Sequence, residues 1–225
     1  MRAAFQNELQ VLRDGLMEVN SLVATALEDA SKALLTGDLA LAEKVIVRDQ
    51  EIDDLQAELD EKAIDVLATQ SPVATDLRTV VATLRMSASL ERMGDLAAHI
   101  ALVLRRRHPN EVIPADLKPT VETLADLSLN AVHDAGKVLE SYDIALAAVI
   151  EERDNNVDRA MDEVYAALSA DDASYSVKES VDLALLARFY ERLGDHAVSI
   201  ARRVVFLVTG DSLDSHNPHT DVDEF

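Results

Sequence analysis

Apolar residues recur at spacings of three and four along almost the whole chain, which is the pattern of helices that each bury one side. Only six glycines and five prolines interrupt the 225 residues, so the predicted helices are long. We expect a first helix from about Ala3 to Leu35, ended by Gly37. A second helix is predicted from a capping residue at Asp38 to about Thr69.

The third predicted helix has signals at both ends. Ser71 followed by Pro72 predicts a capping residue with proline at the first helical position. The run RRRH at 105–108 before Pro109 predicts the end of this helix, because basic side chains suit the C-terminal end of the helix dipole. The stretch PNEVIPADLKP, residues 109–119, holds three of the five prolines and is the predicted linker.

The second half of the chain repeats the first. LERMGDLAAHIA at 90–101 and YERLGDHAVSIA at 190–201 are identical at seven of twelve positions. Residues 32–53 and 137–158 are identical at nine of 22 positions, at an offset of 105 that falls to 100 at the ERxGD motifs. A five-residue contraction is therefore expected near 169–174, and we infer a tandem duplication of a three-helix unit.

These features together predict an all-α fold of six long helices that form two tandem, pseudo-symmetric three-helix bundles. The predicted units are residues 1–108 for the first repeat, 109–119 for the linker and 120–210 for the second repeat. Residues 211–225 are polar, acidic and aperiodic, and we predict that they form a disordered tail.

Charge and composition narrow the possible functions. The formal net charge of −21 repels nucleic acids and anionic membrane surfaces, so no nucleic-acid partner is expected. The absence of cysteine excludes disulfides and thiolate metal ligands. The N-terminal residues lack the apolar core of a signal peptide, and no run of about eighteen apolar residues suggests a membrane span. A cytoplasmic location is expected, with membrane association only through partners.

Pairs of acidic residues, spaced four apart, fall on the apolar sides of four helices. The four pairs are Asp49 and Asp53, Glu91 and Asp95, Asp154 and Asp158, and Glu191 and Asp195. Clustered carboxylates that leave water are unfavourable unless something neutralises them, and divalent cations prefer such hard oxygen ligands. Gly94 and Gly194 each cost about 1 kcal/mol in a helix relative to alanine, so they predict close approach of a neighbouring helix. We therefore hypothesise one metal site of four carboxylates in each repeat.

Two alternatives use the same acidic residues. A ferritin-like di-iron enzyme also clusters acids on long helices, but it needs Glu-x-x-His, and Gly94 and Gly194 stand at the third position after the two motif glutamates. A metal-free helical scaffold would instead pair the acids with arginine. His99 and His196 lie near the motifs, although a lone histidine is more often structural. No nucleophile with a base and no phosphate-binding glycine loop is evident, so no catalytic residue is predicted.

Several of these motifs have a family likeness. SPVATDLRTVVATLR at 71–85 resembles the P-x-A-x-DLR segment of the PhoU family, and LERMGD and YERLGD resemble its paired ERIGD-type motifs. RDQEID at 48–53 and RDNNVD at 153–158 are similar to its acidic stretches on the preceding helix. The resemblance covers essentially residues 1–210.

The resemblance to PhoU implies a fold, a site and a function. It implies two three-helix bundles with metal bound by Asp49, Asp53, Glu91 and Asp95 and by Asp154, Asp158, Glu191 and Asp195. The ion expected is iron, manganese, zinc or magnesium. It further implies a cytoplasmic, dimeric regulator without catalytic activity, which represses phosphate-starvation signalling. The partners implied are the ATPase subunit of a phosphate ABC transporter and a membrane sensor histidine kinase.

The second repeat departs from the family pattern at one corner. Lys178 stands where Arg78 stands in the first repeat, and the local sequence ASYSVKES lacks P-x-A-x-DLR. Any role of that corner is therefore assigned to the first repeat alone.

Overall fold

The computed structural model describes residues 2–211, with side chains from residue 5 onward. It confirms the predicted six-helix, all-α architecture. The helices are α1 (Arg2–Thr36), α2 (Leu39–Gln70), α3 (Ala74–Arg107), α4 (Lys118–Ser141), α5 (Ile144–Leu168) and α6 (Val177–Thr209). The predicted disordered tail lies outside the described residues, apart from Asp211.

Two equivalent aspartates begin the second helix of each repeat, as the duplication predicts. The carboxylate of Asp38 accepts a hydrogen bond from the Leu41 amide at 3.0 Å. The carboxylate of Asp143 accepts from the Ala145 amide at 2.8 Å and from the Leu146 amide at 3.2 Å. Each interaction satisfies backbone donors that the first turn of a helix leaves free.

The predicted start of the third helix is wrong by two residues. Helix α2 continues through Gln70, and Ser71 ends it in the left-handed conformation, with φ 46° and ψ 55°. Ser71 therefore serves α2 and does not cap α3. The N-cap of α3 is Val73, whose side chain makes no capping hydrogen bond, and Pro72 lies before the helix rather than inside it.

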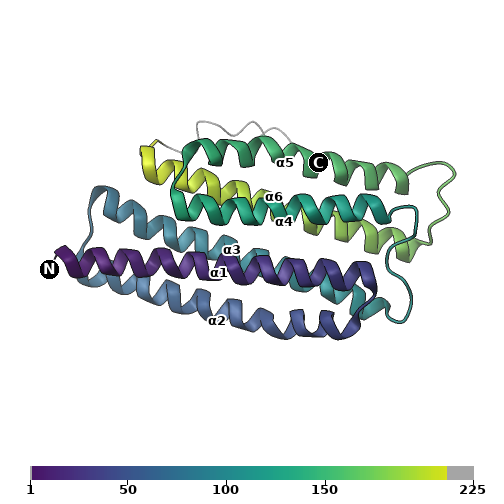
Figure 1. The fold of residues 1–225 in the computed structure, drawn as a ribbon, viewed down its shortest axis with the longest axis horizontal. Helices are drawn as coiled ribbons and strands as arrows, with labels where there is room; N and C mark the ends of the chain where they lie inside the picture. Colours follow the sequence, from purple (N-terminus) through teal and green to yellow (C-terminus); the bar gives the residue numbers. More distant parts are fainter. Residues whose placement is uncertain (1, 212–225) are drawn as a thin grey trace.

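The helices lie roughly along one long axis in two layers, with α1–α3 in one and α4–α6 in the other (Figure 1). Helix α1 packs against α2, α3 and α4, and helix α3 packs against α6 as well as α1 and α2. A continuous core of aliphatic side chains therefore runs through both repeats. Tyr190 is the largest side chain buried completely, and its hydroxyl lies 3.0 Å from Ser31 Oγ of the other repeat.

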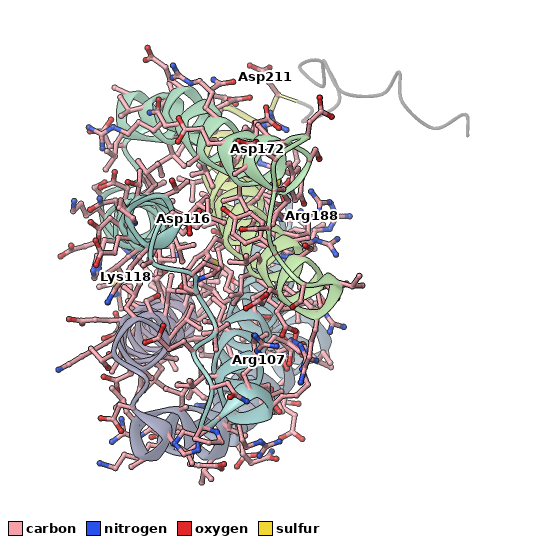
Figure 2. The ribbon with its side chains drawn as sticks, turned by 90° about the vertical axis from the view of Figure 1, so that its right-hand side faces the viewer. Arg107, Asp116, Lys118, Asp172, Arg188 and Asp211 are labelled. Atoms are coloured by element: carbon pink, nitrogen blue, oxygen red, sulfur yellow. The ribbon has the colours of Figure 1, made fainter. Side chains whose placement is uncertain are left out.

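The linker, residues 108–117, crosses one end of the molecule, where Figure 2 labels Arg107, Asp116 and Lys118. Val112, Ile113 and Leu117 are buried, so the linker is part of the packed structure. The predicted contraction of the second repeat lies at α5, which has 25 residues against 32 in α2. Within residues 2–211, no helix is both long and apolar enough to cross a lipid bilayer.

Candidate functional site

The first candidate site lies where α2 passes α3 and brings together the acidic pairs of the two helices. Burial, together with the charges of Asp53 and Asp95, raises the pKa of Asp49 to about 6, against a smaller opposing effect of His99. Burial, followed by the charge of Asp95, also raises the pKa of Glu91. The four predicted side chains of the first repeat therefore share one electrostatic environment.

These carboxylates lie at the edge of the core and remain open to solvent on one side. The side chain of Glu91 is 24% exposed and that of Asp95 is 31% exposed. Arg92 lies over them, with Nη1 at 2.9 Å from Asp95 Oδ2 and Nε at 3.4 Å from Glu91 Oε2. The guanidinium of Arg92 is itself mostly exposed, so it neutralises the pair only in part.

The second candidate site lies between α5 and α6 and is more deeply buried. Burial, followed by the charges of Asp158 and Asp195, raises the pKa of Asp154 to about 7. Burial and then the charge of Asp195 raise the pKa of Glu191 to about 7, although Arg188 opposes them. The Oε2 atom of Glu191 is buried and has no hydrogen-bond partner.

The motif glycines permit the close approach that the sequence predicts. A Cβ atom on Gly94 would lie 3.0 Å from Ile52 Cδ1 and 3.3 Å from Asp49 Oδ1. A Cβ atom on Gly194 would collide with Oδ1 of Asp154. In both repeats, the carboxylate of the preceding helix thus occupies the space that a larger residue would fill.

The structure also shows where the predicted site is less complete. Asp195 is exposed, so its predicted position on the buried side of α6 is wrong. Glu191, one helical turn earlier, is buried. Among residues 5–211, no three acidic or histidine side chains gather closely enough, as they stand, to hold one ion. Mutual repulsion of the carboxylates favours this spread arrangement.

Three charged neighbours complete the two sites and were not assigned to them from the sequence. Arg188 pairs with Glu191, which its position three residues earlier on the helix could have indicated. Glu151 pairs with Arg202 and adds negative charge near Asp154. Its counterpart in the first repeat is Ile46, so the repeat gave no signal for it. His99 acts on Asp49 from the surface.

The residues present suit a hard metal cation. Each site offers four carboxylates, the buried Oε2 of Glu191 has no hydrogen-bond partner, and each glycine leaves room for an aspartate at the helix contact. Carboxylate oxygens are the ligands that magnesium, manganese and iron prefer. A bound cation would relieve the repulsion that raises these pKa values.

Comparison with known proteins identifies the family. The family model described as "PhoU domain" matches this chain twice, over residues 16–104 and 121–204. The chain belongs to the PhoU family. The two matches fall on the two halves of the structure and confirm the resemblance seen in the motifs.

Curated PhoU relatives match along nearly their whole length. The chain is 40% identical over 210 residues to the phosphate-specific transport system accessory protein PhoU homolog 2 of Mycobacterium tuberculosis, covering 93% of this chain and 99% of the relative. It is also 40% identical over 210 residues to PhoU homolog 1 of Mycobacterium leprae, covering 93% and 95%.

Solved PhoU structures share the fold. The crystal structure of PhoU from Pseudomonas aeruginosa has a TM-score of 0.81 at 27% identity, covering 92% of this chain and 100% of that one. The phosphate transport system regulatory protein PhoU from Streptococcus pneumoniae has a TM-score of 0.84 at 24% identity, covering 92% and 98%.

Proposed function

We propose that this chain is a metal-binding accessory regulator of a phosphate-specific transport system. In this proposal it acts in the cytoplasm, as a homodimer and without catalysis. It represses phosphate-starvation signalling by contacting the ATPase subunit of the transporter and the sensor histidine kinase. Membership of the PhoU family and the printed names of the relatives support the link to phosphate transport.

The proposed metal ligands are the eight carboxylates of the two sites. The first site would use Asp49, Asp53, Glu91 and Asp95, and the second would use Asp154, Asp158, Glu191 and Asp195. A bound cation would supply positive charge that holds α2 to α3 and α5 to α6. Its role is therefore structural, and it fixes the surface that these helices present to a partner.

The observation that carries the metal proposal is the desolvation of carboxylates beside the close helix contact at each motif glycine. Asp154 illustrates it, since its carboxylate lies against Gly194 and its pKa is raised to about 7. Keeping several acids at such a contact is unfavourable for the protein alone. A cation that binds only the folded state would offset this cost.

Elemental analysis of the freshly purified full-length chain, combined with melting curves, tests the metal proposal. We expect stoichiometric metal and a lower melting temperature in EDTA that recovers when manganese, iron or zinc is added. A metal present at a hundredfold excess over its Kd stabilises the folded state by about 2.7 kcal/mol. The variant Glu191→Gln should lose metal from the second site only.

A matched control separates metal loss from a general effect of charge. Glu61→Gln removes one exposed carboxylate from α2, away from both sites, and should leave the metal content unchanged. If the protein contains no metal and EDTA leaves its melting curve unchanged, the metal-free scaffold is the better description. Oxygen consumption by the iron-loaded protein would instead support the di-iron enzyme.

Affinity capture tests the signalling part of the proposal independently. The tagged chain should retain the transporter ATPase and the sensor kinase from cells grown in high phosphate, and less of each from cells starved of phosphate. The same experiment with the Asp154→Asn variant asks whether the second site is needed for either contact. Capture of neither protein under either condition would reject the proposed partners.

A further inference from the structure

Helices α3 and α6 meet along a line that we call the seam. Contacts or electrostatic interactions recur every seven residues, and residue numbers rise on α3 as they fall on α6, so the two helices are antiparallel. From one end to the other the facing pairs are Arg78 with Gly210, Arg85 with Arg203, Arg92 with His196, His99 with Phe189 and Arg106 with Asp182.

At the linker end of the seam, the arginines of α3 have acidic partners on α6. Asp182 is only 3% exposed and pairs with Arg106; its Oδ2 atom also lies 3.6 Å from Nε of Arg107. Glu179 Oε1 lies 3.7 Å from Nη2 of Arg107. Figure 2 shows Arg107 at this end of the molecule. The positive charge of α3 is therefore neutralised here by the other repeat.

At the opposite end, three arginines gather without such partners; we call Arg78, Arg85 and Arg203 the cationic end. Arg203 is half-buried, and both its burial and the charge of Arg85 lower its pKa. The Nε atoms of Arg78 and Arg203 are buried and have no hydrogen-bond partner. Within residues 5–211, none of the three forms an ion pair.

The two ends differ because the duplicated sequences differ. At the offset of 100, Glu179 and Asp182 of α6 correspond to Thr79 and Ala82 of α3. The second repeat supplies two carboxylates to its end of the seam, and the first repeat has none at the two equivalent positions. A guanidinium beside another guanidinium, with buried donors unsatisfied, favours the binding of an anion.

We propose that residues 212–225 of this same chain dock on the cationic end and supply the missing carboxylates. The segment contains Asp214, Asp221, Asp223 and Glu224 and has no lysine or arginine. Its charge is thus opposite to that of the surface on which it docks. Arginine binds carboxylates well because its planar fork can engage both oxygens.

Position and length also favour this segment. It follows directly from the end of α6, where a Cβ atom on Gly210 would lie 3.5 Å from Cζ of Arg78. Seven residues of helix separate Arg78 from Arg85, a distance of about 10 Å. An extended chain spans about 3.3 Å per residue, so Asp214 can reach Arg85 and the later acids can reach beyond it. The docked segment would cover this end of the seam and exclude a competing acidic partner.

Distance measurements between two spin labels on the full-length chain test the proposal, since the protein has no native cysteine. One cysteine replaces Thr220 in the segment, and the other replaces Ala88, which is exposed on α3. We expect a narrow distance distribution at about 10 mM salt that broadens at about 1 M salt, because screening weakens exposed ion pairs. Arg85→Gln with Arg203→Gln should broaden it at both salt concentrations.

Arg159→Gln is the matched control, because it removes an exposed arginine of α5 away from the seam; the distribution should stay narrow. A broad distribution at low salt in the unmodified labelled chain would overturn the proposal, as would a narrow one that survives loss of Arg85 and Arg203. Should the double variant not fold, Arg85→Gln alone carries the comparison, since the Arg85 side chain is exposed.

A free oxyanion is the competing occupant, and a second measurement distinguishes it. A chain ended after Asp211 is titrated with inorganic phosphate by calorimetry. Phosphate would be the occupant if its binding is saturable and disappears in Arg85→Gln, and if the distances between the spin labels in the full-length chain are broadly distributed. That result would overturn docking by the segment. Neither result depends on the metal sites, because none of the three arginines belongs to the proposed ligand set.

Discussion

The carboxylate of Asp154 lies directly against Gly194, so that α5 and α6 touch at the one residue of the ERxGD motif that has no side chain. We predict that Gly194→Ala folds well but binds metal poorly. Alanine favours the helix by about 1 kcal/mol, and the flexible Asp154 side chain can turn away from the new methyl group. Melting curves in EDTA should show equal or higher stability, while elemental analysis should show less metal. Unchanged metal content would contradict this prediction.

Gly94→Ala provides the comparison in the first repeat. There the new methyl group would lie 3.0 Å from Ile52 Cδ1 and 3.1 Å from Ile52 Cγ2, in the packed contact between α2 and α3. We expect this variant to gain less stability than Gly194→Ala, because a buried isoleucine moves less easily than the flexible carboxylate of Asp154. The difference between the two melting temperatures measures this effect.

The stability of the metal-free protein should fall as the pH rises. The pKa of Asp49 is raised to about 6, and those of Asp154 and Glu191 to about 7. Between the ordinary carboxyl pKa of about 4 and these values, the folded state binds more protons than the unfolded state, so the free energy of unfolding decreases with pH. Melting temperatures measured in EDTA should therefore drop between about pH 4 and about pH 7, the range that those pKa values set. Asp154→Asn should flatten the curve, and a slope that survives this change would place its origin elsewhere.

The equivalent caps Asp38 and Asp143 allow the two repeats to be compared. Replacing either with alanine should cost about 1 kcal/mol of unfolding free energy. Asp143→Ala should cost at least as much as Asp38→Ala, because Asp143 accepts from two backbone amides and Asp38 from one. Urea unfolding of both variants, with the neighbouring Ala40→Ser as a surface control, measures the difference. A larger cost for Asp38→Ala would show that the hydrogen bonds do not set the order.

The buried hydroxyl pair of Ser31 and Tyr190 joins the two repeats, and its variants should differ in severity. Ser31→Ala leaves the fully buried Tyr190 hydroxyl without a partner, which costs about 1–3 kcal/mol. Tyr190→Phe removes the buried hydroxyl itself and should cost less. The double variant should be more stable than Ser31→Ala alone, as measured by urea unfolding. Additive losses would indicate that the two hydroxyls contribute independently.

The fold could be predicted from the sequence because its main determinants are local. The helical period and the residues Gly37, Asp38 and Asp143 specify helices and their ends within a few residues. The role of Ser71 was predicted incorrectly because a serine can either end one helix or begin the next. Helix α2 extends through Gln70, so Ser71 ends α2. The sequence cannot show which helix gains such a residue when the two are separated by only three positions.

The candidate site was predictable only in part. The repeat and the spacing of four identified Asp49 and Asp154 as desolvated acids, and the glycines indicated the helix contacts. Asp195 was placed incorrectly because residues four apart differ by about 40° around the helix axis, which is enough to expose Asp195 while Glu191 is buried. The electrostatic effect of Arg85 on Arg203 depends on how the two repeats pack together, which no pattern within one helix encodes.

Asp182 affects the orientation in which a partner can bind to the molecule. A duplicated fold would otherwise present the same face in two orientations, and a partner could bind with either repeat leading. Because only one end of the α3–α6 contact carries its own neutralising acids, the face has a direction. A partner that senses charge along this line would meet two unlike ends, and a single binding polarity follows from two differences between the repeats, Glu179 for Thr79 and Asp182 for Ala82.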